Sequence, residues 1–140
     1  MWAAWKSAEK QVARVLGGLR RSRGYNFGDS IEDVIHSEYA IEVKYGNQVP
    51  KWVRYPKPFI TNDYAVVSLD NYALKVVRRQ VKRVKFVEDG LKQALSYDST
   101  GRKVALLVMK PRGYRGLIFA MKREDLGGFI GFLRMKFLVG

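Results

Sequence analysis

The chain has 140 residues, no cysteine and one histidine, and its 26 lysines and arginines against 13 aspartates and glutamates give a net charge of +13. This length suits one domain over residues 1–140, and the charge favours a polyanionic partner, nucleic acid first and an anionic membrane surface second. The composition excludes disulfides, thiolate zinc sites, cysteine nucleophiles and polyhistidine metal centres, so any metal must be held mainly by oxygen.

The N-terminal sequence Met-Trp-Ala-Ala-Trp-Lys becomes charged too early for the apolar core of a signal peptide. The chain also lacks an uninterrupted apolar run of about 18 residues, the length that a membrane-spanning helix needs. We therefore expect a soluble, intracellular protein of the cytoplasm with no membrane partner.

The first predicted element is an amphipathic helix over about residues 3–16 that ends at the glycine pair 17–18. Its apolar stripe is centred on Trp5, Val12 and Leu16, and Glu9 lies within that stripe. A carboxylate among core-facing residues is costly unless it is paired or binds a metal. Glu9 therefore either pairs with a nearby arginine at the rim of the helix or belongs to a metal site.

A basic loop follows this helix. It carries Arg20, Arg21 and Arg23, and its glycines give the backbone freedom to turn. Next to a cation site such a loop would hold a phosphate backbone, whereas on its own it would be an ordinary solvated arginine run.

Two short strands joined by a tight turn are predicted between Asp33 and Lys44. Along the second strand two sets of residues alternate, namely Tyr39, Ile41, Val43 and Tyr45 with Ala40, Glu42 and Lys44. Period-two geometry sends Glu42 and Lys44 to the same face, and Asp33 arrives from the neighbouring strand. Two carboxylates suit a hard cation, and a lysine stabilises developing negative charge. This combination indicates metal-assisted phosphodiester hydrolysis.

Asp33 followed by Glu42-x-Lys44 inside an apolar strand resembles the core motif of the PD-(D/E)XK nuclease superfamily. The resemblance implies a mixed α/β protein with the restriction-endonuclease-like fold, a central mixed β-sheet flanked by α-helices. It also implies that Asp33, Glu42 and the backbone carbonyl of Val43 bind Mg²⁺, for which Mn²⁺ substitutes. In the superfamily a helix-borne glutamate ahead of the motif often completes the active site, and Glu9 matches that position.

The sequence departs from the motif at one point. Ile31-Glu32-Asp33 replaces the hydrophobic-Pro-Asp that names the superfamily, and Asp29, four residues earlier, is a rival metal ligand. We favour Asp33 because it begins the hairpin that closes on Glu42, whereas Asp29 lies in a glycine-containing loop.

The segment over about residues 46–85 is longer than compact members of the superfamily require, and we interpret it as a subgroup-specific insertion. Its first part interleaves the basic residues Lys51 and Arg54 with Trp52 and Tyr55. Such a pattern suits contact with phosphates and unpaired bases, although the two aromatic residues could equally pack beneath a long loop.

The rest of this insertion is predicted to form a strand over residues 64–68 and a basic amphipathic helix over about residues 73–85, with Asp70 as its N-cap. The basic face of that helix carries four arginines and lysines expected to track DNA, namely Arg78, Arg79, Lys82 and Arg83. A membrane-surface helix and a merely solvated face are the alternatives.

A further helix is predicted over about residues 86–97, with Val87, Leu91, Ala94 and Leu95 facing the core. Gln93 and Tyr97 are four residues apart and share a face. In several branches of the superfamily the helix after the Glu-x-Lys strand contributes a glutamine, in some as a Gln-x-x-x-Tyr pattern. Gln93 to Tyr97 resembles this pattern.

The last predicted elements are strands over about residues 103–109 and 117–121 and a C-terminal helix from about Glu124. The helix is unusually apolar: Leu126, Phe129, Ile130, Leu133 and Phe137 form one stripe, and Phe132, Leu138 and Val139 lie outside it. The excess apolar surface indicates either a partner surface, most simply that of a homodimer, or deep burial in the chain's own domain.

Three functions are expected from these residues together with the resemblance to the superfamily and to its small Holliday junction resolvases. The first is a Mg²⁺-dependent endodeoxyribonuclease of DNA recombination and repair, most simply a dimeric Holliday junction resolvase that acts on branched DNA. Its active site would contain Glu9, Asp33, Glu42, Lys44 and Gln93. The second is a nuclease of the same fold in replication, repair or restriction that cuts duplex ends, flaps or single strands. The third is a catalytically silent nucleic-acid-binding module.

Overall fold

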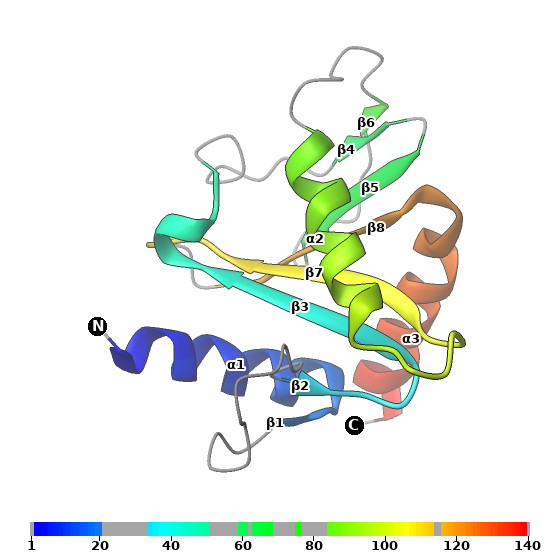
Figure 1. Cartoon of the computed structure of the whole chain (residues 1–140). Coiled ribbons are helices and arrows are strands. Elements are labelled where there is room, and N and C mark those ends of the chain that lie inside the picture. Colours follow the sequence, from blue (N-terminus) through cyan, green and yellow to red (C-terminus); the bar gives the residue numbers. More distant parts are fainter. Residues whose placement is uncertain are drawn as a thin grey trace.

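A mixed β-sheet with helices packed on both faces forms the centre of the computed structural model (Figure 1). The structure describes residues 2–20, 34–50, 59–61, 63–68, 75–76, 84–113 and 116–139. The described helices are α1 (Trp2–Leu16), α2 (Val84–Ser96) and α3 (Leu126–Val139). The described strands are β1 (Leu19–Arg20), β2 (Val34–Ile35), β3 (Tyr39–Tyr45), β4 (Phe59–Ile60), β5 (Tyr64–Ser68), β6 (Lys75–Val76), β7 (Val104–Lys110) and β8 (Ile118–Lys122).

All the described strands belong to one sheet with the order β1-β2-β3-β7-β8-β5-β4-β6. β3 runs parallel to β7, and β4 runs parallel to β6, while the other neighbours are antiparallel. Two parallel neighbours need a long crossover, and α2 lies within the one that joins β3 to β7. The predicted mixed α/β class is confirmed.

The alternation predicted for β3 is also confirmed. Ile41 and Val43 pack into a core that includes α1 and α3, whereas Ala40 packs into the second core, on the side of α2. Because side chains alternate along a strand, Glu42 and Lys44 project from the α2 face of the sheet. The predicted hairpin is present, with Ile35 of β2 opposite Ala40 of β3.

α1 has the predicted boundaries and orientation. It ends at Gly17, whose φ of 79° is unfavourable for other residues and whose N–H donates to the Ala13 carbonyl at 2.8 Å. Val12 and Leu16 are buried, and Lys10 is exposed on the opposite face. The predicted stripe is thus confirmed at Val12 and Leu16, whereas the side chain of Trp5 lies outside the described residues.

His36 connects the end of α1 to the turn between β2 and β3. Its Nδ1 accepts hydrogen bonds from the backbone N–H groups of Glu38 at 3.0 Å and Tyr39 at 3.3 Å. Since Nδ1 is an acceptor, the proton of the neutral ring lies on Nε2, which donates to the Leu16 carbonyl at 3.0 Å. One buried ring thus satisfies a helix-terminal carbonyl and two turn amides.

Replacing His36 with alanine is expected to lower the free energy of unfolding by about 2–3 kcal/mol, because three backbone groups, two of them in buried hydrogen bonds, lose their partner. Urea denaturation followed by circular dichroism measures the change. Lys10→Ala, on the exposed face of α1, is the control and should stay within about 0.5 kcal/mol of the unchanged protein. Equal stability of the two variants would contradict the role assigned to the ring.

α2 lies very close to the sheet. A Cβ atom on Gly90 would be 2.7 Å from Cδ2 of Leu107 on β7, so glycine permits this approach. Val87, Leu91 and Ala94 are buried as predicted, but Leu95 is 41 % exposed, and its predicted core position is wrong. On a helical wheel Leu95 lies about 80° from the centre of the buried stripe, which turns it away from the sheet.

The segment over residues 46–85, interpreted above as an insertion, extends the described sheet beyond β8. Its strand over residues 64–68 is confirmed as β5, and β4 and β6 lie beyond it. The basic helix predicted over residues 73–85 is wrong at Lys75 and Val76, which form β6 parallel to β4, and α2 begins only at Val84. β-branched valines favour strands, so an edge strand competes successfully with the helical pattern here. Asp70 and residues 77–83 lie outside the described residues.

α3 packs against the sheet through Leu126, Phe129 and Leu133, as predicted. Phe132 was expected outside this stripe, yet its ring lies 5.3 Å from that of Tyr39 and 5.4 Å from that of His36. Side chains of the hairpin therefore cover part of the excess apolar surface. In the part of the chain that the structure describes, no helix has the length and apolar character needed to span a membrane.

Candidate functional site

Four side chains, from β3, from α2 and from the residue after α2, form a closed ring of polar contacts on the α2 face of the sheet, which we call the Glu42 ring. It consists of Glu42 and Lys44 from β3, Gln93 from α2, and Tyr97, which directly follows α2. Lys44 Nζ lies 3.3 Å from Glu42 Oε2 and donates to Gln93 Oε1 at 3.4 Å. Gln93 Nε2 donates to the Tyr97 hydroxyl at 3.0 Å, and that hydroxyl donates to Glu42 Oε1 at 3.2 Å.

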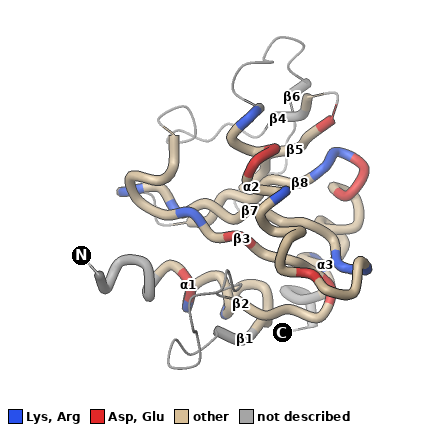
Figure 2. The backbone as a smooth tube through the Cα atoms, in the orientation of Figure 1, with Lys and Arg blue, Asp and Glu red and all other residues tan. Residues whose placement is uncertain are grey.

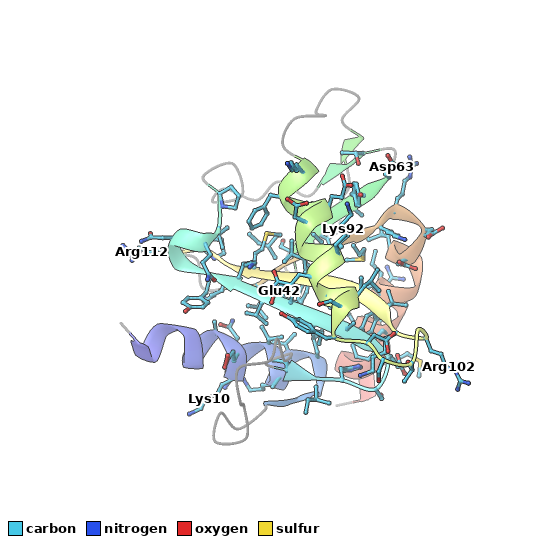
Figure 3. All side chains as sticks on the ribbon, viewed as in Figure 1. Lys10, Glu42, Asp63, Lys92, Arg102 and Arg112 are labelled. Carbon is cyan, nitrogen blue, oxygen red and sulfur yellow. The ribbon has the colours of Figure 1, made fainter. Side chains whose placement is uncertain are left out.

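Regular backbone geometry brings these residues together from distant parts of the chain. Glu42 and Lys44 are two residues apart on a strand, and Gln93 and Tyr97 are spaced by one helical turn. The close packing of α2 at Gly90 then brings the two pairs within contact distance, as Figure 3 shows for Glu42 beneath α2. The predicted pairing of Gln93 with Tyr97 on one face is confirmed.

The donors and acceptors of the ring determine its orientation. A lysine ammonium only donates, so the oxygen of the Gln93 amide must face Lys44 and the nitrogen must face Tyr97. The Tyr97 hydroxyl accepts from that nitrogen and uses its own proton toward Glu42. Within the ring Glu42 accepts from Tyr97 and faces the ammonium of Lys44, both of which suit an ionised carboxylate.

Burial differs sharply between the two charged members of the ring. The Glu42 side chain is 6 % exposed, and the Lys44 side chain is 24 % exposed. A buried carboxylate is costly unless charge and hydrogen bonds compensate it, and Lys44 and Tyr97 provide both. Between these two charges, Lys44 is the one that solvent reaches more readily.

This arrangement has a definite chemical capacity. An anionic carboxylate offers oxygen to a hard divalent cation, and the neighbouring ammonium stabilises negative charge that develops beside it. Gln93 and Tyr97 hold both groups in position from the helix, because each contacts one of them directly.

Glu9 is buried, with 3 % of its surface exposed, in agreement with its predicted place in the apolar stripe of α1. It lies outside the Glu42 ring. α1 packs against the face of β3 that carries Ile41 and Val43, whereas Glu42 projects from the opposite face. The role of Glu9 in a metal site stays a prediction.

The metal site expected from the sequence is only partly within the described residues. Among those residues no three acidic or histidine side chains gather in a way that would hold a metal ion. Asp33 and its rival Asp29 lie outside them. Val43 is described, with its side chain in the α1 core, and the metal contact of its carbonyl stays a prediction.

The predicted DNA-binding residues also fall largely outside the described part of the chain. This applies to Arg21, Arg23, Lys51, Arg54, Arg78, Arg79, Lys82 and Arg83. For Arg20 only the backbone is described, as the last residue of β1. Their contacts with DNA remain predictions.

Sequence reasoning assigned no role to two cations at the end of β7. Lys110 closes this strand opposite Tyr45, and Arg112 is exposed two residues later. Burial lowers the pKa of the Lys110 ammonium below its usual range. The sequence does show that Lys110 ends an apolar strand with a charge. It does not show that β7 pairs with β3, and without that pairing Lys110 could not be placed beside the predicted catalytic strand.

The Glu42 ring therefore combines Glu42 and Lys44 of β3, the strand predicted to be catalytic, with Gln93 of α2 and with Tyr97, which follows α2. Comparisons of the chain with protein-family models, with curated proteins and with solved structures found no match.

Proposed function

We propose that the chain is a metal-dependent DNA endonuclease of the PD-(D/E)XK superfamily with the restriction-endonuclease-like fold, and that branched DNA such as a Holliday junction is its substrate. The Glu42 ring is the observation that carries this proposal. The resemblance implies a glutamine on the helix after the Glu-x-Lys strand, and Gln93 contacts Lys44 from that helix. A mixed sheet flanked by helices agrees with the implied fold.

Mg²⁺, or Mn²⁺ in its place, would supply an activated water and screen the phosphate charge when bound. Glu42 would hold the ion through carboxylate oxygen, together with Asp33 and the backbone carbonyl of Val43. The predicted role of Glu9, to complete a second metal site or to orient the hydrated ion, would require its carboxylate to act from the α1 side of β3, opposite to Glu42. The donor chemistry of Glu42 fits this task, because its carboxylate acts as an acceptor with no competing thiolate or imidazole in the ring.

Lys44, Gln93 and Tyr97 would position the reacting groups and stabilise the charge that develops during cleavage. Lys44 orients the attacking water and stabilises the negative charge that grows on the phosphorus. Tyr97 holds the Glu42 carboxylate, and Gln93 holds the Lys44 ammonium, so that neither needs to reorganise during the reaction.

DNA as the substrate is supported by the net charge of +13. The basic loop of Arg20, Arg21 and Arg23 and the basic insertion are proposed to contact its backbone. A homodimer is proposed for symmetric cleavage of two strands; Met135, 69 % exposed on α3, would be the residue through which to test it.

Incubation of the protein with labelled four-way junction, flap, duplex and single-stranded DNA tests this proposal, with Mg²⁺, with Mn²⁺ and with chelator. We expect symmetric nicks near the branch point of the junction, in the presence of either metal and not with chelator. Cleavage restricted to flaps, ends or single strands would select a different substrate for the same chemistry. Binding without cleavage under every divalent metal would overturn the assignment as a nuclease.

A further inference from the structure

The carboxyl ends of β3 and β7 lie side by side because these two strands are parallel. Tyr45 is paired with Lys110, and Lys44 is paired with Met109. Neighbouring strands are separated by roughly 4.8 Å, so the last residues of both strands form one short edge. In parallel sheets this edge is where ligands commonly bind.

This edge is uniformly basic. Neither residues 43–50 nor residues 104–113 contain an aspartate or a glutamate, and they contribute Lys44, Lys110 and Arg112. Basic segments mark this end of the sheet in Figure 2. Lys44, paired with Met109, projects from the α2 face, whereas Lys110, paired with Tyr45, projects from the α1 face, so these cations flank the edge on both of its sides.

The opposite end of the same two strands is mixed in charge. The carbonyl of Glu38, just before β3, accepts from the N–H of Val104 at the start of β7. Glu38 itself is exposed, and Asp98 accepts a hydrogen bond from the Lys103 backbone N–H at 2.9 Å. In Figure 3 Arg112 marks the basic end and Arg102 the mixed end, with Glu42 between them. Charge is thus polarised along β3 and β7.

Burial makes the basic edge receptive to an anion. The pKa of Lys110 is lowered because part of its ammonium's hydration is lost on burial. A phosphate placed beside it would accept a charge-assisted hydrogen bond from the ammonium. Arg112 is exposed and presents a guanidinium that suits phosphate oxygens. Lys44, the more exposed charge of the Glu42 ring, lies on the same edge.

We propose that the carboxyl edge of β3 and β7 binds the phosphate backbone of the nucleic acid adjoining the bond to be cut, with Lys110 and Arg112 as its contacts. This inference rests on the proposed function, since it takes nucleic acid as the ligand. It gives the DNA strand a defined approach across the ends of β3 and β7, from Lys110 on the α1 face past Arg112 and Lys44 to Glu42 on the α2 face. Neither Lys110 nor Arg112 takes part in the reaction itself.

Binding of a labelled DNA duplex to Arg112→Ser, measured by fluorescence anisotropy at several salt concentrations without divalent metal, tests this subsite. Loss of one phosphate contact makes the slope of log K against log salt shallower by about 0.9 and weakens binding about eightfold at roughly 0.1 M salt. Lys110→Met, which keeps the apolar stem of the half-buried side chain, should give a change of similar size. Arg102→Ser removes the same charge from the other end of β7 and should leave both quantities unchanged.

Equal salt slopes for Arg112→Ser and Arg102→Ser would overturn the subsite, because net charge alone would then explain the loss. Because Arg112 is exposed, its replacement does not threaten the fold. The measurement needs no cleavage and is therefore independent of the proposed reaction. If the protein cuts no DNA but binds it through Arg112, the proposed nuclease activity is refuted and the subsite stands. If the protein cuts DNA and Arg112→Ser leaves the salt slope unchanged, the subsite is refuted and the nuclease activity stands.

Discussion

Replacing Glu42 with glutamine is expected to reduce Mg²⁺-dependent DNA cleavage at least roughly a thousandfold, equivalent to about 4 kcal/mol of transition-state stabilisation. Glutamine has nearly the same volume, so packing beneath α2 should be preserved. It lacks the negative charge that would hold a divalent cation and that pairs with Lys44 at 3.3 Å. Initial cleavage rates on labelled junction DNA measure the effect, and DNA affinity without metal should be nearly unchanged.

Tyr97→Phe is a second variant of the same site, with a smaller expected loss of cleavage than Glu42→Gln. It removes only the hydroxyl that donates to Glu42 Oε1 at 3.2 Å, while Lys44 keeps its contact with the carboxylate. Loss of a group that orients a metal ligand typically costs 10–100-fold in activity or metal affinity, and we expect a decrease of about that size. Undiminished cleavage by purified Glu42→Gln would refute the assignment of the site, and Tyr97→Phe as damaging as Glu42→Gln would contradict the supporting role of the hydroxyl.

Phe129→Ala is expected to lower the free energy of unfolding by about 3–5 kcal/mol, the largest effect on stability that we predict. Phe129 is fully buried, and its ring lies 4.9 Å from that of Phe119 and 5.7 Å from that of Tyr39. Truncation would leave a cavity between α3 and the sheet and remove both aromatic contacts. Thermal and urea unfolding measure the loss.

Met135→Ala provides the matched control on the same helix. Met135 is exposed, so its truncation creates no cavity and should change the stability of the monomer by less than about 0.5 kcal/mol. A small effect of Phe129→Ala would show that α3 contributes little to the fold. A concentration-dependent loss of stability in Met135→Ala would instead support the proposed dimer.

Local patterns in the sequence predicted those parts of the fold that depend on periodicity. The alternation from Tyr39 to Tyr45 predicted β3 and the shared face of Glu42 and Lys44, and the 3.6-residue period predicted α1 with Glu9 buried. These predictions succeed because side-chain direction follows directly from backbone geometry in a regular element. The same geometry placed Gln93 and Tyr97 on one face of α2.

The errors occurred where neighbouring elements compete for the same residues. Lys75 and Val76 match a helical stripe, yet pairing with β4 makes them a strand. Phe132 lies outside the main stripe of α3, as predicted, and the pattern left open whether its own domain or a partner covers it; the structure shows His36 and Tyr39 of the hairpin against its ring. No local pattern specifies which partner surface will be present, because that surface comes from residues far away in the chain.

The candidate site shows the same division. The sequence by itself determined the chemistry available, with a carboxylate and an ammonium on one strand face and an amide and a hydroxyl on one helix face. Only the tertiary structure decided that these two faces meet, because α2 approaches the sheet at Gly90 closely enough for Gln93 to contact Lys44 and for Tyr97 to contact Glu42. It also decided that β7 lies parallel to β3 and brings Lys110 and Arg112 to the same edge, since strand pairing depends on burial of the whole sheet rather than on either strand alone.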